Sequence, residues 1–214
     1  MARFLVTGVA GFIGSHIAEY LLKEGHYVVG IDNFSIGLST TIDFLKKHSN
    51  SHLFTFFESD LRNINECYDL CRDVDFVLHH AALSSVPMSI KEPATFMENN
   101  IASTANLLEA SSQQSIKRFV LASSASVYGV KDDDCVESDL LKPISPYAIS
   151  KASCERLCYY YYYSKGLKTI NLRYFNVYGA RQNPFSDYAA VVPLFIHLAQ
   201  QDKPLCIFGD GSQT

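Results

Sequence analysis

The chain has 214 residues, a length that fits one large domain or one domain and part of another. Hydrophobic residues make up 48% of the sequence, which predicts a packed core and excludes a disordered chain. The net charge of -4, without a basic block, argues against a nucleic acid or an anionic membrane as a partner, and no apolar run is long enough to cross a bilayer.

The first predicted strand, residues 4–6, leads into three glycines spaced three apart, Gly8, Gly11 and Gly14, and then into a helix. Such a turn presents unpaired backbone N–H groups to an anion, and it allows a pyrophosphate to approach closely. A second apolar strand, residues 27–31, ends in Asp32, whose carboxylate could accept the ribose hydroxyls of a dinucleotide. Glycine spacing alone is a weak signal, but strand, helix, strand and acid together favour a dinucleotide site.

Later elements repeat the alternation of strand and helix. The helix after Gly14 is closed by Gly25, and residues 33–50 are expected to form a loop and a short helix. Strands are predicted at 52–57, 75–82, 118–124 and 168–174, and helices at 64–72, 93–112 and 147–165. This order predicts an α/β fold with a parallel sheet, whose ligands bind beyond the carboxyl ends of the strands. Residues at or near those ends are Gly8, Asp32, Asp60, Ala81, Ser124 and Phe175.

Tyr147 and Lys151 stand four apart, on one face of the predicted helix 147–165. Alone, the pair is equally typical of a helix surface, but its place after a dinucleotide-type turn and a strand ending in Ser124 favours a catalytic site. Lowering a tyrosine pKa from ~10 to ~7 takes about 4 kcal/mol. A positive charge ~4 Å away supplies about that much at an effective dielectric of ~20. We expect Lys151 and an oxidised nicotinamide ring to provide it, and Ser124 to hold the substrate hydroxyl against Tyr147.

The sequence resembles the extended short-chain dehydrogenase/reductases in motifs spread over the whole chain. These motifs are Gly8-x-x-Gly11-x-x-Gly14, Asp32-Asn33, Asp60-Leu61, His80-Ala81-Ala82, Asn99-Asn100-Ile101, residues 123–129, Ser145-Pro146-Tyr147-x-x-x-Lys151 and residues 172–179. Within that family the chain is most similar to the nucleotide-sugar 4-epimerases. Residues 81–90 and 188–193 are similar to the branch that acts on UDP-N-acetylhexosamines.

The resemblance implies a Rossmann-type doubly wound sheet and an NAD-dependent enzyme that interconverts UDP-hexoses or UDP-N-acetylhexosamines at C4 through a 4-keto intermediate. Tyr147, Lys151 and Ser124 would be catalytic. The implied NAD-binding residues are Gly8, Gly11, Phe12, Ile13, Gly14, Asp32, Asn33, Asp60, Leu61, Ala81, Ala82, Leu83, Asn99, Tyr147, Lys151 and Phe175. The implied substrate-binding residues are Ser85, Ser124, Ser126, Tyr147 and Asn176. Asp32 favours NAD over a cofactor with a 2′-phosphate, which would meet a like charge.

Four other functions can be compared with that of a 4-epimerase. The related sugar dehydratases and decarboxylases carry carboxylates next to the strand-end serine or threonine, where this chain has Ala125-Ser126-Val127. An elimination needs a further acid/base group, so these activities are not expected. A related oxidoreductase that releases its reduced cofactor, and a non-catalytic NAD-binding protein, remain alternatives to the epimerase.

Members of the resembled family continue beyond the position of Thr214. The resemblance therefore predicts an NAD-binding domain at residues 1–178 and the beginning of an incomplete sugar-nucleotide-binding domain at residues 179–214. We expect the chain by itself to bind NAD but to turn over poorly. Within the tyrosine run 159–163, we expect some rings to pack on the sheet and others to enter a helix-to-helix contact of a homodimer.

Cysteine and histidine spacing argues against a metal. The six cysteines form no Cys-x-x-Cys pair, and two pairs have the i, i+4 spacing of helix packing. His79 and His80 are adjacent in a predicted strand, so their rings should point to opposite faces. We therefore expect a reduced, cytoplasmic protein without a metal site.

Overall fold

The computed structural model describes residues 1–131, 133–184, 190–207 and 209–211. The chain divides into two units, Met1–Phe175 and Asn176–Thr214, and each is described by itself. The boundary between them lies close to the predicted domain boundary after residue 178.

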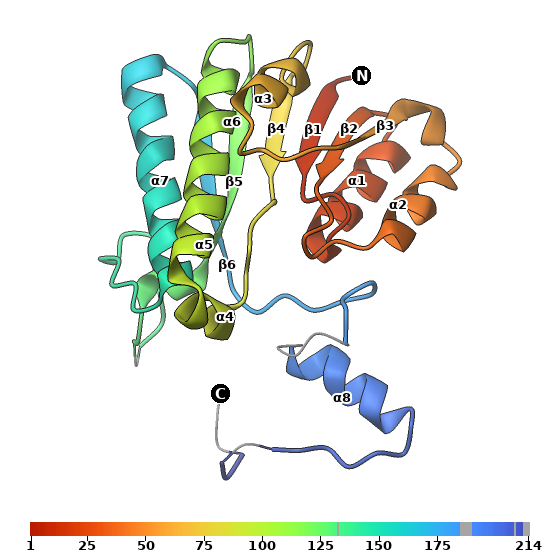
Figure 1. Ribbon diagram of the computed structural model, residues 1–214, viewed down its shortest axis with the longest axis vertical. Coiled ribbons are helices and arrows are strands. Elements are labelled where there is room, and N and C mark those ends of the chain that lie inside the picture. Colours follow the sequence, from red (N-terminus) through yellow and green to blue (C-terminus); the bar gives the residue numbers. More distant parts are fainter. Residues whose placement is uncertain (132, 185–189, 208, 212–214) are drawn as a thin grey trace. The chain divides into compact units, whose positions relative to one another are not determined.

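The first unit is built on one parallel sheet of six strands in the order β3-β2-β1-β4-β5-β6 (Figure 1). The strands are β1 Arg3–Thr7, β2 Tyr27–Asp32, β3 Phe54–Glu58, β4 Phe76–His79, β5 Arg118–Ser124 and β6 Thr169–Tyr174. The chain begins in the middle, moves outward to β3, and returns to β4 on the other side of β1. The strand order therefore reverses between β1 and β4, where such sheets bind ligands. This topology confirms the predicted doubly wound fold.

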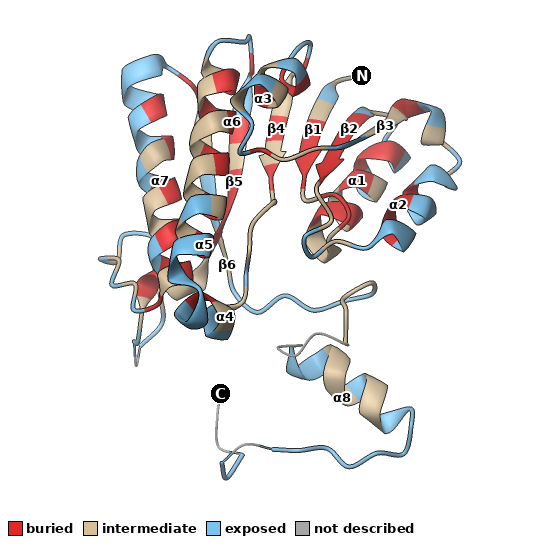
Figure 2. Cartoon of the chain, viewed as in Figure 1, coloured by how far each residue is buried: buried red, intermediate tan, exposed pale blue. Residues whose placement is uncertain are grey.

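Helices cover both faces of the sheet. Helices α1 (Phe12–Lys23) and α2 (Ser39–Lys46) pack on one face, and α3 (Ile64–Leu70), α6 (Ser103–Ser112) and α7 (Pro146–Lys165) on the other. Because side chains alternate along a strand, the neighbours Leu5 and Val6 enter different hydrophobic clusters. Figure 2 shows buried residues along β1, β2, β4 and β5 and on the sheet-facing sides of these helices.

Helix α7 begins and ends where the sequence predicts. The hydroxyl of Ser145 accepts a hydrogen bond from the backbone N–H of Ala148 at 3.2 Å, and Pro146 occupies the first turn. Gly166 closes the helix with a φ of 72°, in the left-handed region. Tyr147 and Lys151 are thereby fixed on its first turns.

Several predicted elements differ in their bounds from the structure. The helix predicted after Gly14 begins earlier, at Phe12. The helix predicted at 93–112 consists of α5 (Pro93–Met97), the π-helix η2 (Glu98–Ala102) and α6. Strand β4 ends at His79 rather than at residue 82, because the N–H groups of His80 and Ala81 both donate to the hydroxyl of Thr7, at 3.1 and 3.0 Å. Strand β3 begins at Phe54 rather than at residue 52, because Ser51–Leu53 form the short helix η1. Short elements without a sequence prediction are α4 (Val86–Lys91), η3 (Ala125–Tyr128) and α8 (Val191–Ala199).

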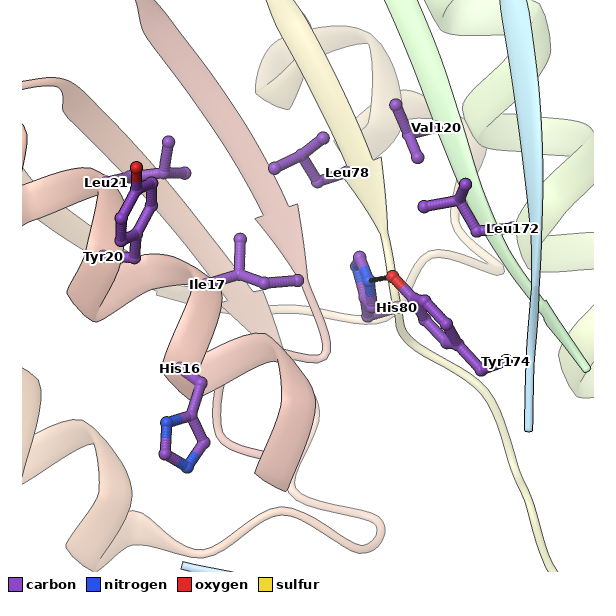
Figure 3. A pocket seen from close by; sticks show the side chains of 9 residues that line it. All are labelled: His16, Ile17, Tyr20, Leu21, Leu78, His80, Val120, Leu172 and Tyr174. Atoms are coloured by element: carbon purple, nitrogen blue, oxygen red, sulfur yellow. Dashed lines mark hydrogen bonds between the residues drawn. The ribbon is translucent and has the colours of Figure 1, made fainter. Parts of the chain in front are cut away.

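On the α1 side of the sheet, Leu78, Val120 and Leu172 of three neighbouring strands line an open, apolar hollow of ≈ 500 Å³ (Figure 3). His80 and Tyr174 lie at its end, where a ring nitrogen and the phenol oxygen are 3.2 Å apart.

In the second unit, α8 has no buried residue. Tyr188 and Ala189, part of the 188–193 resemblance, lie outside the described residues. Nowhere in the described part of the chain is a helix both long and apolar enough to cross a membrane.

Candidate active site

The glycine turn closes the space between β1, α1 and the end of β4. Gly8 has a φ of 68°, and a Cβ there would lie 2.8 Å from the nitrogen of Ala81. A Cβ on Gly14 would lie 2.2 Å from the carbonyl oxygen of Gly8. Gly11 is different, since its Cβ would meet only the Gly8 oxygen, at 3.1 Å. Packing therefore requires the outer two glycines, while Gly11 keeps one side of the turn open.

No side chain caps the first turn of α1, which begins at Phe12 after Gly11. The N–H groups of a first helical turn have no partner within the helix, and the helix dipole adds positive potential there. This turn, with Phe12 and Ile13 beside an open Gly11, fits a pyrophosphate.

Asp32 ends β2 next to this turn. Its Oδ2 accepts from the N–H of Ala10 at 3.0 Å and its Oδ1 from that of Phe34 at 2.9 Å. Burial raises the pKa of the carboxyl, and the backbone hydrogen bonds oppose that rise. Because each carboxylate oxygen has two lone pairs, acceptor capacity remains for ribose hydroxyls.

The Asp60-Leu61 pair lies beyond β3. The carboxylate of Asp60 accepts from Arg62, with 2.7 Å between Nη2 and Oδ2, and from the side chain of Asn33 at 3.2 Å. The Arg62 hydrogen bond lowers the pKa of Asp60 to about 2. The side chain of Leu61 is buried in the core, so an adenine ring would meet the backbone of this turn rather than that side chain.

Ser124, Ser126 and Tyr147 form a directed chain of hydroxyl groups. The Ser124 hydroxyl accepts from the N–H of Ser126 at 3.2 Å and from the Ser126 hydroxyl at 2.9 Å. Its acceptor capacity is then filled, so its own proton is left to point toward the phenol of Tyr147, whose pKa the Ser124 side chain lowers. A hydroxyl that donates to a phenol oxygen favours the phenolate.

The pKa of Tyr147 nevertheless lies above its ordinary value, because burial outweighs the hydrogen bond from Ser124. The ammonium of Lys151 is also buried, and it donates to the backbone oxygen of Ala122 at 2.8 Å. Burial lowers the pKa of Lys151. In this arrangement the protein groups alone do not give the lowered tyrosine pKa expected from the sequence, since desolvation of the phenol is the larger effect.

Asn100, which was not among the predicted site residues, holds the loop after β4 in place. The carboxamide of Asn100 accepts from the N–H of Leu83 at 2.8 Å and donates to its carbonyl oxygen at 3.0 Å. This pairing fixes the half-buried residues Ala81 to Leu83 beside η2, which also carries Asn99. Two adjacent asparagines within a predicted helix were the available signal, since asparagine is a poor helix former.

Three other predicted site residues, Ser85, Phe175 and Asn176, have no described contact with Ser124, Tyr147 or Lys151. The Ser85 hydroxyl caps α4 and accepts from the N–H of Met88 at 3.2 Å. Phe175 is exposed, with its ring centroid 6.3 Å from that of Tyr128. Asn176 is the first residue of the second unit and is exposed.

The sequence did not predict an ion pair beside the site, between the buried Glu155 and the half-buried Arg173. Arg173 of β6 binds both carboxylate oxygens of Glu155 in α7, at 3.0 and 2.9 Å, and Ser123 donates to the same carboxylate at 2.5 Å. The guanidinium also donates to the hydroxyl of Tyr128 in η3 at 3.0 Å. This pair ties α7 to β5, β6 and η3, the elements that carry the catalytic candidates.

The two adjacent histidines diverge. The ring of His79 bonds to Thr7 and Thr104 on the α6 side, whereas His80 bonds to Tyr174 on the α1 side. Among the residues that the structure describes, no three His, Cys, Asp or Glu side chains are grouped so that they could hold a metal ion.

Comparison with known proteins places the chain. A family model described as "NAD dependent epimerase/dehydratase family" matches residues 4–214. An uncharacterized UDP-glucose epimerase of Bacillus subtilis is 41% identical over 99% of this chain and 67% of its own length. The UDP-glucuronate 4-epimerase of Thermodesulfobacterium geofontis is 36% identical over 100% of this chain and 67% of its own.

A solved structure of the UDP-N-acetylglucosamine 4-epimerase from Methanobrevibacter ruminantium, in complex with UDP-N-acetylmuramic acid, is similar with a TM-score of 0.92 and 39% identity. The match covers 99% of this chain and 67% of that one. The chain thus spans about two thirds of the length of these relatives. The model match, the relatives and the shared fold together show that this chain belongs to the NAD dependent epimerase/dehydratase family, within the extended short-chain dehydrogenase/reductases.

Proposed function

We propose that this chain binds NAD at the carboxyl edge of its sheet and carries the catalytic residues of a UDP-sugar 4-epimerase. The observation that carries the proposal is the chain of hydroxyl groups from Ser126 through Ser124 to Tyr147. It places a hydroxyl donor beside the phenol, and that donor acts on the Tyr147 pKa in the direction that favours proton removal from a substrate alcohol. The relatives named UDP-glucuronate and UDP-N-acetylglucosamine 4-epimerases support this choice of reaction.

The residues at the sheet edge fit NAD. Gly11 keeps the turn after β1 open where Gly8 and Gly14 are closed by packing, and the uncapped first turn of α1 suits a pyrophosphate. Asp32 retains acceptor capacity for the ribose hydroxyls. A related UDP-glucuronic acid 4-epimerase from Bacillus cereus, 40% identical, was crystallised with NAD.

Bound NAD would supply a hydride acceptor for the sugar C4 and return the hydride to its other face. Tyr147 would take the proton from the C4 hydroxyl, and Ser124 would hold that hydroxyl by turning its own proton from the phenol to the sugar oxygen. Lys151, one turn further along α7, would hold the nicotinamide ribose and favour the phenolate by its charge. The sequence Ala125-Ser126-Val127 offers no carboxylate beside Ser124, which favours epimerisation over the decarboxylation and dehydration named for other relatives.

We further propose UDP-hexoses or UDP-N-acetylhexosamines as substrates, held by Ser85, Ser126 and Asn176, with residues 179–214 as the beginning of the sugar-nucleotide-binding domain. A cytoplasmic location is proposed from the six free cysteines. A homodimer through the long helices is proposed from the exposed tyrosines of α7, among them Tyr159 and Tyr163, whereas Tyr161 is buried and donates to Glu109 at 2.8 Å.

The test combines Tyr147→Phe with Tyr159→Phe, an exposed tyrosine of the same helix, as control. NAD affinity is measured by calorimetry, and the conversion of UDP-sugars is followed by chromatography of the epimers. We expect slow turnover in the parent chain, a loss of about 100-fold or more in Tyr147→Phe, and no change in the control. NAD binding should persist in all three. Unchanged turnover in Tyr147→Phe, or a parent chain that does not bind NAD, would contradict the proposal.

Ser124→Ala provides a second measurement that does not need turnover. It removes the hydrogen bond that opposes the effect of burial, so the pKa of Tyr147 should rise further above its ordinary value. NMR of ¹³C-labelled tyrosine follows this titration directly. A Tyr147 pKa that stays the same or falls would contradict the directed chain of hydroxyl groups.

A further inference from the structure

His79 is a buried imidazole with both ring nitrogens engaged, and the proposed chemistry does not use it. Its side chain is 2% exposed, at the end of β4. Nδ1 lies 2.8 Å from the hydroxyl of Thr7 in β1, and Nε2 lies 3.0 Å from that of Thr104 in α6. The ring therefore joins the strand before the glycine turn to a helix on the opposite layer.

The hydrogen bonds at Thr7 settle which nitrogen carries the proton. The Thr7 hydroxyl already accepts from the N–H groups of His80 and Ala81. Both of its lone pairs are then in use, so its single proton must be donated to Nδ1 of His79. Nδ1 is therefore unprotonated, and a neutral ring carries its hydrogen on Nε2, which donates to Thr104.

Thr104 continues the same direction. Its hydroxyl accepts a hydrogen bond from the Nε2–H of His79 at 3.0 Å and one from the Cys154 thiol at 3.2 Å, and it donates to the backbone oxygen of Asn100 at 2.7 Å. Asn100 lies in the π-helix η2, and its carboxamide holds Leu83. The ring is thus connected, through one hydroxyl, to the residue that fixes the loop after β4.

A last step reaches the catalytic helix. The Asn100 carboxamide also donates to the hydroxyl of Ser150 at 2.9 Å, and Ser150 donates to the backbone oxygen of Tyr147 at 2.7 Å. Asn100 therefore stands between the ring and both the loop at Leu83 and the first turn of α7, so a change in the ring would propagate to both.

We infer that His79, held as the neutral Nε2–H tautomer, is a positioning residue that couples the nucleotide turn after β1 to the loop at Leu83 and to the start of α7. A second ring proton on Nδ1 would face a hydroxyl with no free acceptor site, so the path excludes the charged form. The low pKa of His79, which burial and the nearby charges of Lys151 and His80 produce, agrees with this geometry. The consequence for NAD rests on the proposed function, whereas the hydrogen-bonded path does not.

The tautomer is tested first, in the unmodified chain, by ¹⁵N NMR of the histidine rings. We expect His79 to show a protonated Nε2 and an unprotonated Nδ1, unchanged across the neutral pH range. A protonated Nδ1, or a ring that titrates like an exposed histidine, would overturn the inference.

The coupling is tested by Thr104→Val, which keeps the side-chain shape and removes the hydroxyl. Leu108→Ala, in the same helix and fully buried but outside the path, is the control for lost stability. We expect hydrogen exchange at the Leu83 amide to become about five- to thirtyfold faster in Thr104→Val than in the control, and NAD to bind more weakly by a similar factor. Equal exchange rates at Leu83 in the two variants would contradict the coupling, because lost packing alone would then explain the effect of Thr104→Val.

Two further substitutions separate the two arms of the ring. His79→Asn keeps an acceptor near the Nδ1 position, and His79→Gln keeps a donor near the Nε2 position. In His79→Asn, hydrogen exchange should stay slow at the Ala81 amide and become faster at the Leu83 amide. In His79→Gln, exchange should become faster at Ala81 and stay slow at Leu83. Equal exchange patterns in both would overturn the inference. If the parent chain fails to bind NAD while these exchange patterns hold, the proposed function fails and the positioning path stands.

Discussion

Replacing Gly14 by alanine should separate the packing of the nucleotide turn from its chemistry. The new Cβ would lie 2.2 Å from the Gly8 oxygen and 2.8 Å from the Gly8 carbonyl carbon, both backbone atoms that cannot rotate away. Helix α1 would have to move off β1. Overpacking of this kind costs about 3 kcal/mol or more. For a chain of this size, that loss lowers Tm by about 6–12 °C in a thermal unfolding scan.

Gly11→Ala is the matched control. Its φ of -83° suits alanine, and its Cβ would have one contact, 3.1 Å from the Gly8 oxygen. Stability should change by less than about 1 kcal/mol. The methyl group would stand where the pyrophosphate is proposed, so NAD should bind about tenfold more weakly or worse by calorimetry. A Gly14→Ala chain with unchanged Tm would refute the packing argument, and a Gly11→Ala chain with unchanged affinity would refute the anion site.

Two ion pairs give further predictions. Glu155→Gln leaves the guanidinium of Arg173 without its buried partner and should lower the free energy of unfolding by about 3 kcal/mol in urea, whereas Asp69→Asn, which breaks an exposed pair, should change it little. Because the pKa of Asp60 falls from 3.8 to about 2 beside Arg62, its share of stability is present above pH 3.8 and is lost as the pH drops toward 2. In Asp60→Asn, urea titrations over that range should show a smaller loss; an identical loss would contradict the assignment.

The sequence predicted the elements whose signals are local. Glycines at a strand-to-helix turn, Ser145 and Pro146 before α7 and Gly166 after it each act within a few residues. The predicted bounds of α7 hold to within one residue, whereas α1 begins at Phe12, before Gly14. The parallel order of strands followed from their alternation with helices. The sequence could assign Ser124 and Tyr147 to one site because Ser124 ends a predicted strand and Tyr147 begins a predicted helix.

Contacts between distant segments could not be read in the same way. The pairing of Asn100 with Leu83, and of Arg173 with Glu155, depends on how helices pack on the sheet. The pKa of Tyr147 shows the same limit. Helix spacing predicted that Lys151 and an oxidised nicotinamide ring together would lower it. Desolvation by everything packed around the phenol, which raises the pKa of Tyr147, could not be read from the spacing, nor could the hydrogen bond from Lys151 to Ala122.

The early end of β4 explains why the site can exist at this edge. If β4 had continued, the N–H groups of His80 and Ala81 would have paired with a neighbouring strand and closed the crevice. Thr7 accepts both hydrogen bonds instead, so the sheet stops without unsatisfied backbone groups. The same hydroxyl must then donate to His79. The hydroxyl that ends β4 beside the glycine turn is therefore also the one that fixes the tautomer of the His79 ring.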